Sequence, residues 1–566
     1  MKKFLQVNLL LSFFTGLSAS ATELAWQQTL DEENTWSRLT FAGTLLVASE
    51  NQLAHFDPST GEVIWQRVDM RELAQFDVRD VSGTPFLVIN EHVSSRPKRS
   101  RLQLLDLGNG ENIWDTGEIA GYVLGSYPLP RKNLLLSALS MQRSGDSKSG
   151  IYLVAYSLGD GEELWRTYLG SKSSLPVHRS DASTIEDFSG HPQPIVTDDT
   201  FILVAGDLVA IDLASGEEVW RFKLRASVDN VKQTYAQPLL WDGILYAAGR
   251  SNLHAIDVAT GVEQWKVKIG SAAMPQLELR DNLIVGRLGG TFSTGKDLVR
   301  KSPFGAFAVD TIQGKLVWKW TKARDSVTNI EVILDQGLVM LADKKKLYAL
   351  DLHASGKGKV VYEEDLEFKR KLGAADIAAK GLKTIGGLLS GKVNLGGDDD
   401  RGDPPLDIEA YGDLLIVRAQ YHVLAHDMFE HKSVWSIEFA PPGMHPLALV
   451  AMGAVTAYVV ADRASTGGAY GSSWEHQQLL DSALTMSSSF EAAVAARYAA
   501  TEKSRNLAFF LTQEEDGIVL VGIDLLDGTV VGQIPMAEKS PQFMVDAIAS
   551  RVYYFREKSE LLAYDF

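Results

Sequence analysis

Short apolar runs alternate along the chain with turns rich in Gly, Asp and Asn. One example is Gly243-Ile-Leu-Tyr-Ala-Ala followed by Asn252-Leu-His-Ala-Ile, and another is Asp413-Leu-Leu-Ile-Val followed by Tyr421-His-Val-Leu-Ala. Runs of this length, bounded by turn residues, are typical of antiparallel β-strands. The pattern predicts an all-β chain of short strands.

A fixed frame, Ala-x-Asp-x-x-x-Gly-x-x-x-Trp, returns after these strand pairs. It is complete at Ala210-Asp212-Gly216-Trp220, Ala255-Asp257-Gly261-Trp265 and Ala308-Asp310-Gly314-Trp318. Its Asp, Gly and Trp positions also match at Asp57-Gly61-Trp65 and Asp106-Gly110-Trp114, and degenerate copies lie at Ser157-Gly161-Trp165, Asp351 with Gly356 and Tyr362, Asp427-His431-Trp435 and Asp524-Gly528-Gly532. A self-similar unit of this size predicts a repeat array.

Each residue of the frame has a physical role in a four-stranded unit. The Gly is expected in the turn between the last two strands, where a positive φ is needed. A large ring on the last strand packs between adjacent sheets, and the small Ala leaves room for it. We therefore predict a structural role in docking one sheet on the next for Trp26, Trp65, Trp114, Trp165, Trp220, Trp265, Trp318 and Trp435.

Units of four strands repeated radially predict a β-propeller. The C-terminal Leu561-Leu-Ala-Tyr-Asp565-Phe is the front half of a frame, and Glu23-Leu-Ala-Trp26 near the N-terminus is the back half. We expect the two ends to share one blade and close the ring. Counting this split unit gives ten frames, and the sequence leaves eight to ten blades open. Two smaller propellers are the alternative architecture.

Length and charge narrow the class of protein. A chain of 566 residues exceeds one compact core, so several domains or an array is expected. The formal net charge of −17 argues against nucleic acid as a partner, because phosphate binding needs clustered Lys and Arg. The chain has no Cys, which excludes disulfides, thiolate metal sites and a lipid-anchoring Cys.

The first 21 residues have the pattern of a cleaved signal peptide. Lys2 and Lys3 precede an apolar stretch from Phe4 to Leu17, and Ala19-Ser20-Ala21 is a small-residue cleavage site. The segment predicts export, with a mature chain of residues 22–566 that is periplasmic or secreted. No later stretch is apolar over the roughly 18 residues that a membrane-spanning helix needs.

The repeated frame resembles that of the pyrroloquinoline-quinone-like (PQQ-like) β-propeller superfamily over almost the whole of residues 22–566. That superfamily includes quinoprotein alcohol dehydrogenases and non-enzymatic propellers such as the BamB lipoprotein of the outer-membrane β-barrel assembly machinery. The resemblance implies the fold. In character the chain is closest to the BamB-like propellers.

We predict no catalytic, cofactor or metal residues. The resemblance to the dehydrogenases would imply Glu, Asn and Asp ligands for quinone and calcium with a disulfide of adjacent cysteines, and no local segment supplies them. The run Asp398-Asp399-Asp400-Arg401-Gly402-Asp403 is interpreted as a solvated acidic loop, since its Gly and the following prolines do not fit a calcium loop. His422 and His426 could share a strand face, and His431 takes the Gly position of a turn.

Two insertions interrupt the repeat. Residues 363–410 contain apolar positions at helical spacing with lysines elsewhere, which predicts a basic amphipathic helix, weakened by several glycines. It either packs on the ring or meets a membrane surface or partner groove. Its candidate contact residues are Leu372, Ile377, Lys380, Leu382, Lys383, Ile385 and Leu389. Residues 463–505 predict a loop followed by a second helix, with Ser488 and Glu491 as a capping box.

From the sequence we expect an exported propeller that is a scaffold for protein–protein interaction in the cell envelope, with a possible role in outer-membrane protein assembly. A divergent quinoprotein oxidoreductase is one alternative. A binder of a carbohydrate or small ligand in the central channel is another. We expect no nucleic acid partner, and peripheral contact with a membrane stays open.

Overall fold

The computed structural model describes most of the chain after residue 21, in the ranges 22–95, 97–141, 149–171, 178–179, 186–187, 194–205, 207–224, 236–293, 298–325, 327–366, 368, 403–419, 422–439, 507–514, 517–538, 541–546 and 549–566. These residues form 42 β-strands and three short 3-10 turns, η1 (Gln75–Asp77), η2 (Pro130–Lys132) and η3 (Leu334–Gln336). The predicted all-β class is confirmed. The predicted signal segment 1–21 lies outside the described residues.

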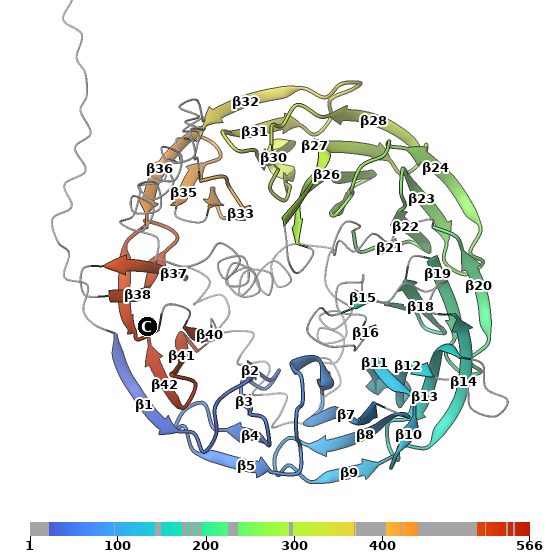
Figure 1. Cartoon of the computed structure of the whole chain (residues 1–566). Coiled ribbons are helices and arrows are strands. Elements are labelled where there is room, and N and C mark those ends of the chain that lie inside the picture. The colour runs from blue at the N-terminus through green and yellow to red at the C-terminus, as the bar shows by residue number, and fades with distance from the viewer. Residues whose placement is uncertain are drawn as a thin grey trace, which may run out of the picture.

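The strands form ten antiparallel sheets arranged as the blades of one ring (Figure 1). Blades 1 to 5 follow the chain order and consist of β2 (Trp36–Leu39), β3 (Leu45–Ala48), β4 (Leu53–Phe56) and β5 (Val63–Arg67); β6 (Val78–Val81), β7 (Phe86–Ser95), β8 (Lys98–Asp106) and β9 (Asn112–Asp115); β11 (Tyr122–Leu129), β12 (Leu134–Met141), β13 (Gly150–Ser157) and β14 (Glu163–Gly170); β17 (Ile195–Val196), β18 (Thr200–Ala205), β19 (Asp207–Asp212) and β20 (Glu218–Phe222); and β21 (Leu239–Trp241), β22 (Ile244–Ala248), β23 (Asn252–Asp257) and β24 (Glu263–Lys268).

Blades 6 to 10 complete the ring. They consist of β25 (Leu277–Arg280), β26 (Leu283–Ser293), β27 (Leu298–Asp310) and β28 (Lys315–Trp320); β29 (Glu331–Ile333), β30 (Leu338–Ala342), β31 (Lys346–Asp351) and β32 (Val360–Asp365); β33 (Asp407–Tyr411), β34 (Leu414–Arg418), β35 (His422–Asp427) and β36 (Lys432–Glu438); β37 (Leu507–Glu514), β38 (Gly517–Asp524) and β39 (Val530–Met536); and β40 (Gln542–Asp546), β41 (Arg551–Arg556), β42 (Glu560–Asp565) and β1 (Glu23–Thr29). Outside this scheme, β10 (Ile119–Ala120) pairs with β8, and β15 (His178–Arg179) pairs with β16 (Glu186–Asp187).

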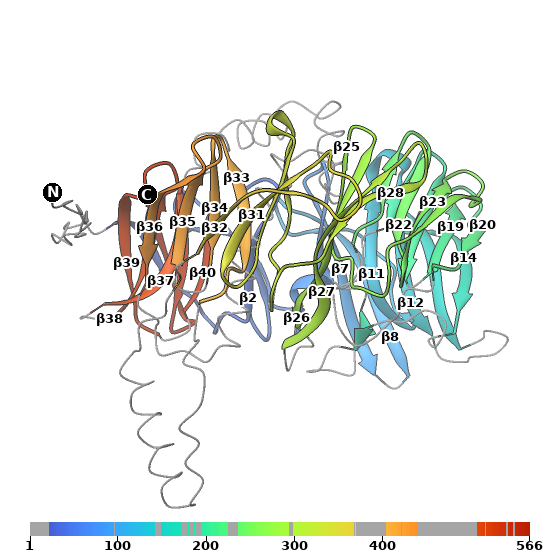
Figure 2. The ribbon, with the colours of Figure 1, turned by 90° about the horizontal axis from the view of Figure 1, so that it is seen from above.

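The chain thus folds as a single ten-bladed propeller, at the upper end of the eight to ten blades left open, rather than as two smaller rings. The first strand of a blade, such as β2, β33 or β40, lies nearest the centre, and the last strand lies on the circumference (Figure 1). Viewed at right angles, neighbouring blades stand side by side around the ring (Figure 2).

Burial follows this radial order. All residues of β12 and β13, the middle strands of blade 3, are buried, whereas one residue of the outermost strand β14 is buried and half of its residues are exposed. Middle strands have a neighbouring blade against each face, and such strands read as continuous apolar runs rather than alternating ones. The hydrophobic core therefore lies between blades, as a series of clusters that each join residues of adjacent blades.

The Asp and Gly of the frame build the turn between the last two strands. In blade 4 the Asp212 carboxylate accepts the backbone N–H groups of Ala214 (3.0 Å) and Ser215 (2.7 Å), and these bonds lower its pKa. Gly216 then adopts a φ of 74°, and the equivalent His431 of blade 8 adopts 53°. A left-handed backbone at this position favours Gly, which explains why the frame repeats it.

The Trp ring of a frame packs on the Gly turn of the next blade, except at Trp318, where a Cβ added to Gly356 would meet nothing within 4 Å. A Cβ added to Gly216 would lie 2.4 Å from the Trp165 ring, so the ring occupies the space that a side chain would need. At seven junctions the indole N–H also donates to the carbonyl of the residue after the frame's Asp or Ser, as Trp26 to Pro58 (3.0 Å), Trp65 to Leu107 (2.6 Å), Trp114 to Leu158 (2.7 Å), Trp165 to Leu213 (3.0 Å), Trp220 to Val258 (2.9 Å), Trp265 to Thr311 (3.0 Å) and Trp318 to Leu352 (2.9 Å).

The eighth tryptophan departs from this scheme. The Trp435 ring packs on Gly528 of blade 9, where an added Cβ would lie 2.8 Å away. Among the described residues, its Nε1 has no hydrogen-bond partner. Trp435 therefore provides packing at the junction of blades 8 and 9 without the hydrogen bond made by the other seven.

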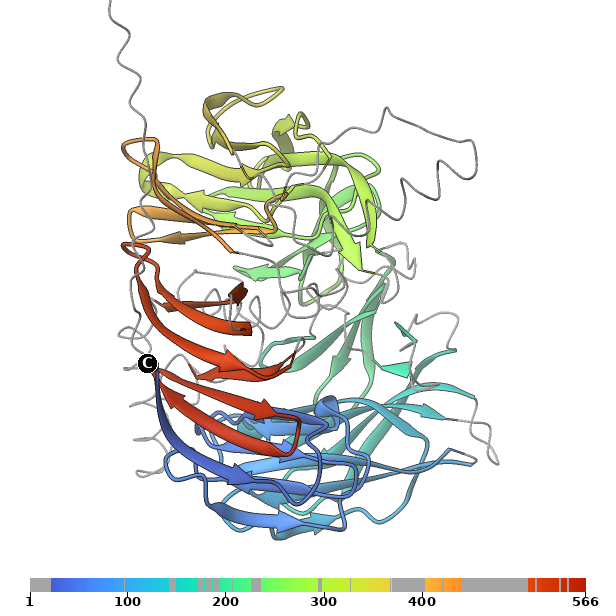
Figure 3. The same cartoon turned by 60° about the vertical axis from the view of Figure 1, so that its left-hand side comes forward.

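The two ends of the chain close the ring in blade 10, as predicted. Strand β1 pairs antiparallel with β42, from Glu23 opposite Asp565 to Thr29 opposite Glu560 (Figure 3). Trp26 lies opposite Ala563, which is the Trp–Ala pairing seen inside the continuous frames. The sheet edge of β42 is thereby covered within the same chain.

The predicted insertions lie mostly beyond the part of the chain that the structure describes. Residues 363–365 belong to β32 and residues 407–410 to β33, and the helix expected between them falls within 369–402. The range 463–505 is likewise outside the described residues. The two helical insertions stay predictions.

A matched pair of substitutions tests the indole hydrogen bond. Trp114→Phe removes the donor to the buried Leu158 carbonyl, so we expect a loss of about 1–3 kcal/mol in the free energy of unfolding and a lower Tm. Trp435→Phe removes no hydrogen bond found among the described residues, and its Tm should fall less. Thermal unfolding of both variants measures the difference, and equal losses would contradict this account of the junctions.

Candidate functional site

The candidate partner contacts predicted from the sequence, Leu372 to Leu389, all lie outside the described residues. Of the acidic run 398–403, only Asp403 is described. It is buried, and its Oδ2 lies 2.8 Å from His422 Nδ1, while the His422 ring stacks on Phe368. Asp403 thus anchors a histidine of blade 8. No group of three or more His, Asp or Glu suited to a metal ion occurs among the described residues.

The other two histidines of blade 8 lie at its junction with blade 7. Here Tyr362 replaces the frame's Trp, and its ring centroid lies 4.0 Å from that of His431, which replaces the Gly. The buried His426 places Nε2 3.2 Å from the Tyr362 hydroxyl and Nδ1 2.5 Å from Glu364. Burial lowers the pKa of His426, and the Glu364 carboxylate opposes that shift. These four side chains, Tyr362, Glu364, His426 and His431, rebuild the junction contact in polar form.

A serine, a histidine and an aspartate come together in blade 2, but they do not form a catalytic site. Ser100 Oγ lies 3.5 Å from His92 Nδ1, and His92 Nε2 lies 3.2 Å from Asp77 Oδ1. Ser100 is fully buried, and its hydroxyl accepts the backbone N–H of Val123 in blade 3 at 3.3 Å. A nucleophile must reach a substrate, so this row is best explained as a link between blades.

The inner wall of blades 6 to 8 is joined by side-chain amides. Gln276 donates from Nε2 to the Ile330 carbonyl and accepts the Ile330 N–H, each at 2.8 Å. Asn329 binds the Ile408 peptide in the same way, at 2.7 and 2.8 Å. Each amide therefore pairs with a peptide group of the next blade, as a neighbouring strand would. The innermost strands β25, β29 and β33 are held side by side.

Six charged side chains gather on this part of the wall. They are Glu278 and Arg280 on β25, Glu331 on β29, Asp407 and Glu409 on β33, and Arg418 on β34. Glu278 lies 2.8 Å from Arg280, and Arg418 Nε donates to Asp407 at 2.8 Å. Four carboxyl groups thus face two guanidinium groups. Burial raises the pKa of Glu331 to about 8, and the charges of Glu278 and Glu409 add to the rise.

The protonation state of Glu331 determines what this part of the wall can do chemically. At neutral pH Glu331 is largely protonated, so its carboxyl group can donate a hydrogen bond or exchange a proton. No sequence motif indicated this group of charges, although Leu277-Glu-Leu-Arg280 alternates apolar and charged residues in the way an inner strand would. Only the ring brings Glu278, Glu331 and Glu409 together, because each comes from a different repeat.

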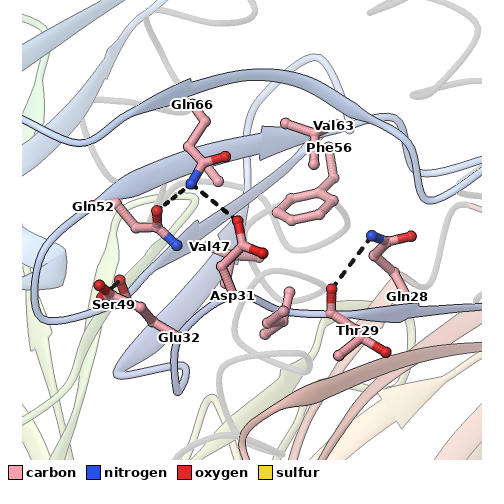
Figure 4. A pocket seen from close by; sticks show the side chains of 12 residues that line it. Gln28, Thr29, Asp31, Glu32, Val47, Ser49, Gln52, Phe56, Val63 and Gln66 are labelled. Carbon is pink, nitrogen blue, oxygen red and sulfur yellow. Dashed lines mark hydrogen bonds between the residues drawn. The ribbon is translucent and has the colours of Figure 1, made fainter.

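A cavity of about 50 Å³ lies at the junction where the ring closes, between β1 of blade 10 and blade 1 (Figure 4). Its apolar side includes Phe56 and Val47, which are buried, and Val63, which is 43% exposed, together with Leu30 and Ala54. The segment that follows β1 supplies Asp31 and Glu32. We call this cavity the closure pocket.

The polar side of the closure pocket is rich in amides and carboxylates. Gln66 donates from Nε2 to Asp31 at 3.4 Å and also to the side chain of Gln52 (Figure 4). Gln28 donates to the backbone carbonyl of its neighbour Thr29 at 3.3 Å. The amide oxygens and the Asp31 carboxylate line the pocket with hydrogen-bond acceptors.

Glu32 is fixed by the loop beneath it. Its carboxylate accepts the Ser49 hydroxyl at 2.6 Å and the backbone and side-chain N–H groups of Asn51, each at 3.2 Å. The Ser49 bond is the main cause of a lowered pKa of Glu32, with a smaller effect of the Arg71 charge. Glu32 is therefore ionised at neutral pH. No sequence pattern indicated this pocket, because its two sides come from the closing strand and from the first complete repeat.

A known protein family has a sequence pattern similar to these repeats. The family model described as outer membrane protein assembly factor BamB matches residues 14–135 and 142–292, just under half of the chain. The resemblance to PQQ-like propellers predicted from the frame is thereby confirmed. No curated protein matches the sequence.

Solved structures similar to this chain include BamB and two alcohol-oxidising dehydrogenases. BamB from Moraxella catarrhalis is 13% identical, with a TM-score of 0.34, and the match covers 70% of this chain and 97% of that chain. A europium-containing methanol dehydrogenase is 11% identical, with a TM-score of 0.32 and coverage of 74% and 81%. A quinohemoprotein alcohol dehydrogenase from Pseudomonas putida is 12% identical, with a TM-score of 0.30 and coverage of 96% and 76%. None of these likenesses bears on activity.

The raised pKa of Glu331 makes a stability prediction. A carboxyl group whose folded pKa of about 8 exceeds the ordinary 4.5 contributes fully below pH 4.5, and this contribution is lost as the pH rises through 8. Glu331→Gln removes that loss, so it should stabilise the protein by about 1–3 kcal/mol at pH 8 and by less at pH 5. Thermal unfolding from pH 5 to 9 measures this, with the exposed Glu217→Gln as control. A difference independent of pH would show that Glu331 does not titrate in this range.

Proposed function

We propose that this PQQ-like β-propeller is an exported scaffold that binds a protein partner in the cell envelope. The match to the outer membrane protein assembly factor BamB family carries the proposal. By analogy with that family's description, the partner is a component or a client of outer-membrane protein assembly. The proposal includes cleavage of the segment 1–21 and a periplasmic or secreted mature chain.

The use of the frame residues supports a scaffold. Seven of the eight frame tryptophans donate a hydrogen bond from the indole N–H to the neighbouring blade, and the eighth packs against that blade without one. The repeated residues thus serve the rigidity of the ring. Rigid propellers present variable loops and surfaces to partners, and function resides in those surfaces.

Charge and membrane topology are consistent with this role. The net charge of −17 favours association with a basic surface and makes it sensitive to salt. Among the described residues no helix is long and apolar enough to cross a membrane.

Affinity capture tests the proposal. The purified chain, residues 22–566, is immobilised and exposed to envelope extract, and each captured protein is purified and titrated against it. We expect saturable binding of an envelope protein that weakens several-fold between 50 and about 300 mM salt. No saturable binding to any envelope protein would overturn the scaffold.

A cofactor assay tests the alternative of a quinoprotein. The same preparation is incubated with pyrroloquinoline quinone and Ca²⁺, and dye reduction is followed with alcohols. The scaffold proposal expects no turnover above that of the heat-unfolded chain. Alcohol-dependent dye reduction would overturn the proposal in favour of an oxidoreductase.

A further inference from the structure

The closure pocket has a size that restricts its occupant. Each water needs roughly 10–15 Å³ of such volume, so about 50 Å³ holds roughly three to five waters. Sites for whole sugars or cofactors measure about 300–1,000 Å³. The pocket is therefore suited to the tip of a side chain that enters from a larger molecule.

The charge of the pocket selects a cationic tip. Twelve residues line the pocket. Asp31 and Glu32 are the two ionisable residues among them, and none of the twelve is Lys, Arg or His. Glu32 is occupied by Ser49 and Asn51, whereas Asp31 is exposed and accepts one long bond, from Gln66 at 3.4 Å. A carboxylate has about four acceptor positions, so Asp31 retains capacity for a charged donor.

The apolar side of the pocket suits the stem of such a side chain. Phe56 and Val47 form a floor that is 3% and 5% exposed, and Val63 extends it outward at 43% exposure. Lysine and arginine bury their methylene stems along apolar surface while the charged head meets polar groups. Val63 and Phe56 provide the apolar surface for the stem, and the oxygen atoms of Asp31 and Gln28 beside them provide the polar surface for the head (Figure 4).

We propose that the closure pocket binds the cationic end of a lysine or arginine side chain presented by a protein partner. The inference rests on the proposed scaffold function and deepens it, because it assigns one contact of the partner to a basic residue. The pocket lies where β1 and β5 meet on the circumference of the ring (Figure 1). The partner would therefore contact the outer rim at the closing junction.

A small probe tests the pocket without a partner. n-Propylguanidinium carries the arginine head, and n-propylurea has nearly the same shape without the charge. Ligand-observed NMR titration of the full mature chain should show binding of the guanidinium and at least tenfold weaker binding of the urea. Asp31→Asn should weaken guanidinium binding about tenfold, and Asp31→Asn with Glu32→Gln should abolish it.

Glu62→Gln is the matched control, because Glu62 is an exposed acid in the same blade that does not line the pocket. It should leave guanidinium binding unchanged, and thermal unfolding checks that every variant is folded. Equal binding of the urea, or binding unaffected by Asp31→Asn, would overturn the inference.

The partner found by affinity capture provides the second measurement. Asp31→Lys should weaken its binding at least tenfold, and replacing one basic residue of the partner with Glu should restore binding to that variant. If the partner binds wild type and Asp31→Lys equally, the closure pocket is not its contact, and the scaffold function still stands. If wild type captures no envelope protein, the scaffold function itself fails.

Discussion

The ring depends on one repeated contact, in which an indole ring lies on a glycine turn of the next blade. Two conditions must hold there together: a left-handed backbone and no side chain above it. Gly216, with a φ of 74° and the Trp165 ring 2.4 Å from where its Cβ would lie, satisfies both. The indole N–H then binds the carbonyl that follows the Asp of the turn. Neighbouring blades lie farther apart at the circumference than near the axis. This contact holds their outer edges together.

Those contacts explain why the architecture was readable from the sequence. The Asp, Gly and Trp of a frame lie within nine residues, and their spacing is set by a turn and a strand whose geometry is local. The split frame of Asp565 and Trp26 predicted the closing blade for the same reason. His431 could be placed in a turn because it substitutes the Gly, and it has the expected positive φ.

The inner wall of blades 6 to 8 and the closure pocket could not be predicted from the sequence in this way. Glu278, Glu331 and Glu409 each look like an ordinary polar residue of a short strand, and the raised pKa of Glu331 arises only when three blades bring them together. Asp31 follows the closing strand, while Phe56 and Gln66 belong to the first complete blade. At the junction of blades 7 and 8 the frame itself changes, and the indole contact is replaced by a Tyr362–His426 hydrogen bond and a close His426–Glu364 contact. Departures from the repeat depend on neighbours in space, which one repeat does not encode.

The pairing of β1 with β42 also means that the ring closes only when both strands are present. Gln27 meets Glu560 across a separation of 533 residues, so the first strand has no partner until the last one has been synthesised. Chains emerge and fold from the N-terminal end, and unpaired strand edges are sites of aggregation and proteolysis. A prematurely terminated chain would keep nine blades in sequence yet leave its first strand open. In such a chain the unpaired strand edge would lie on the rim of the ring.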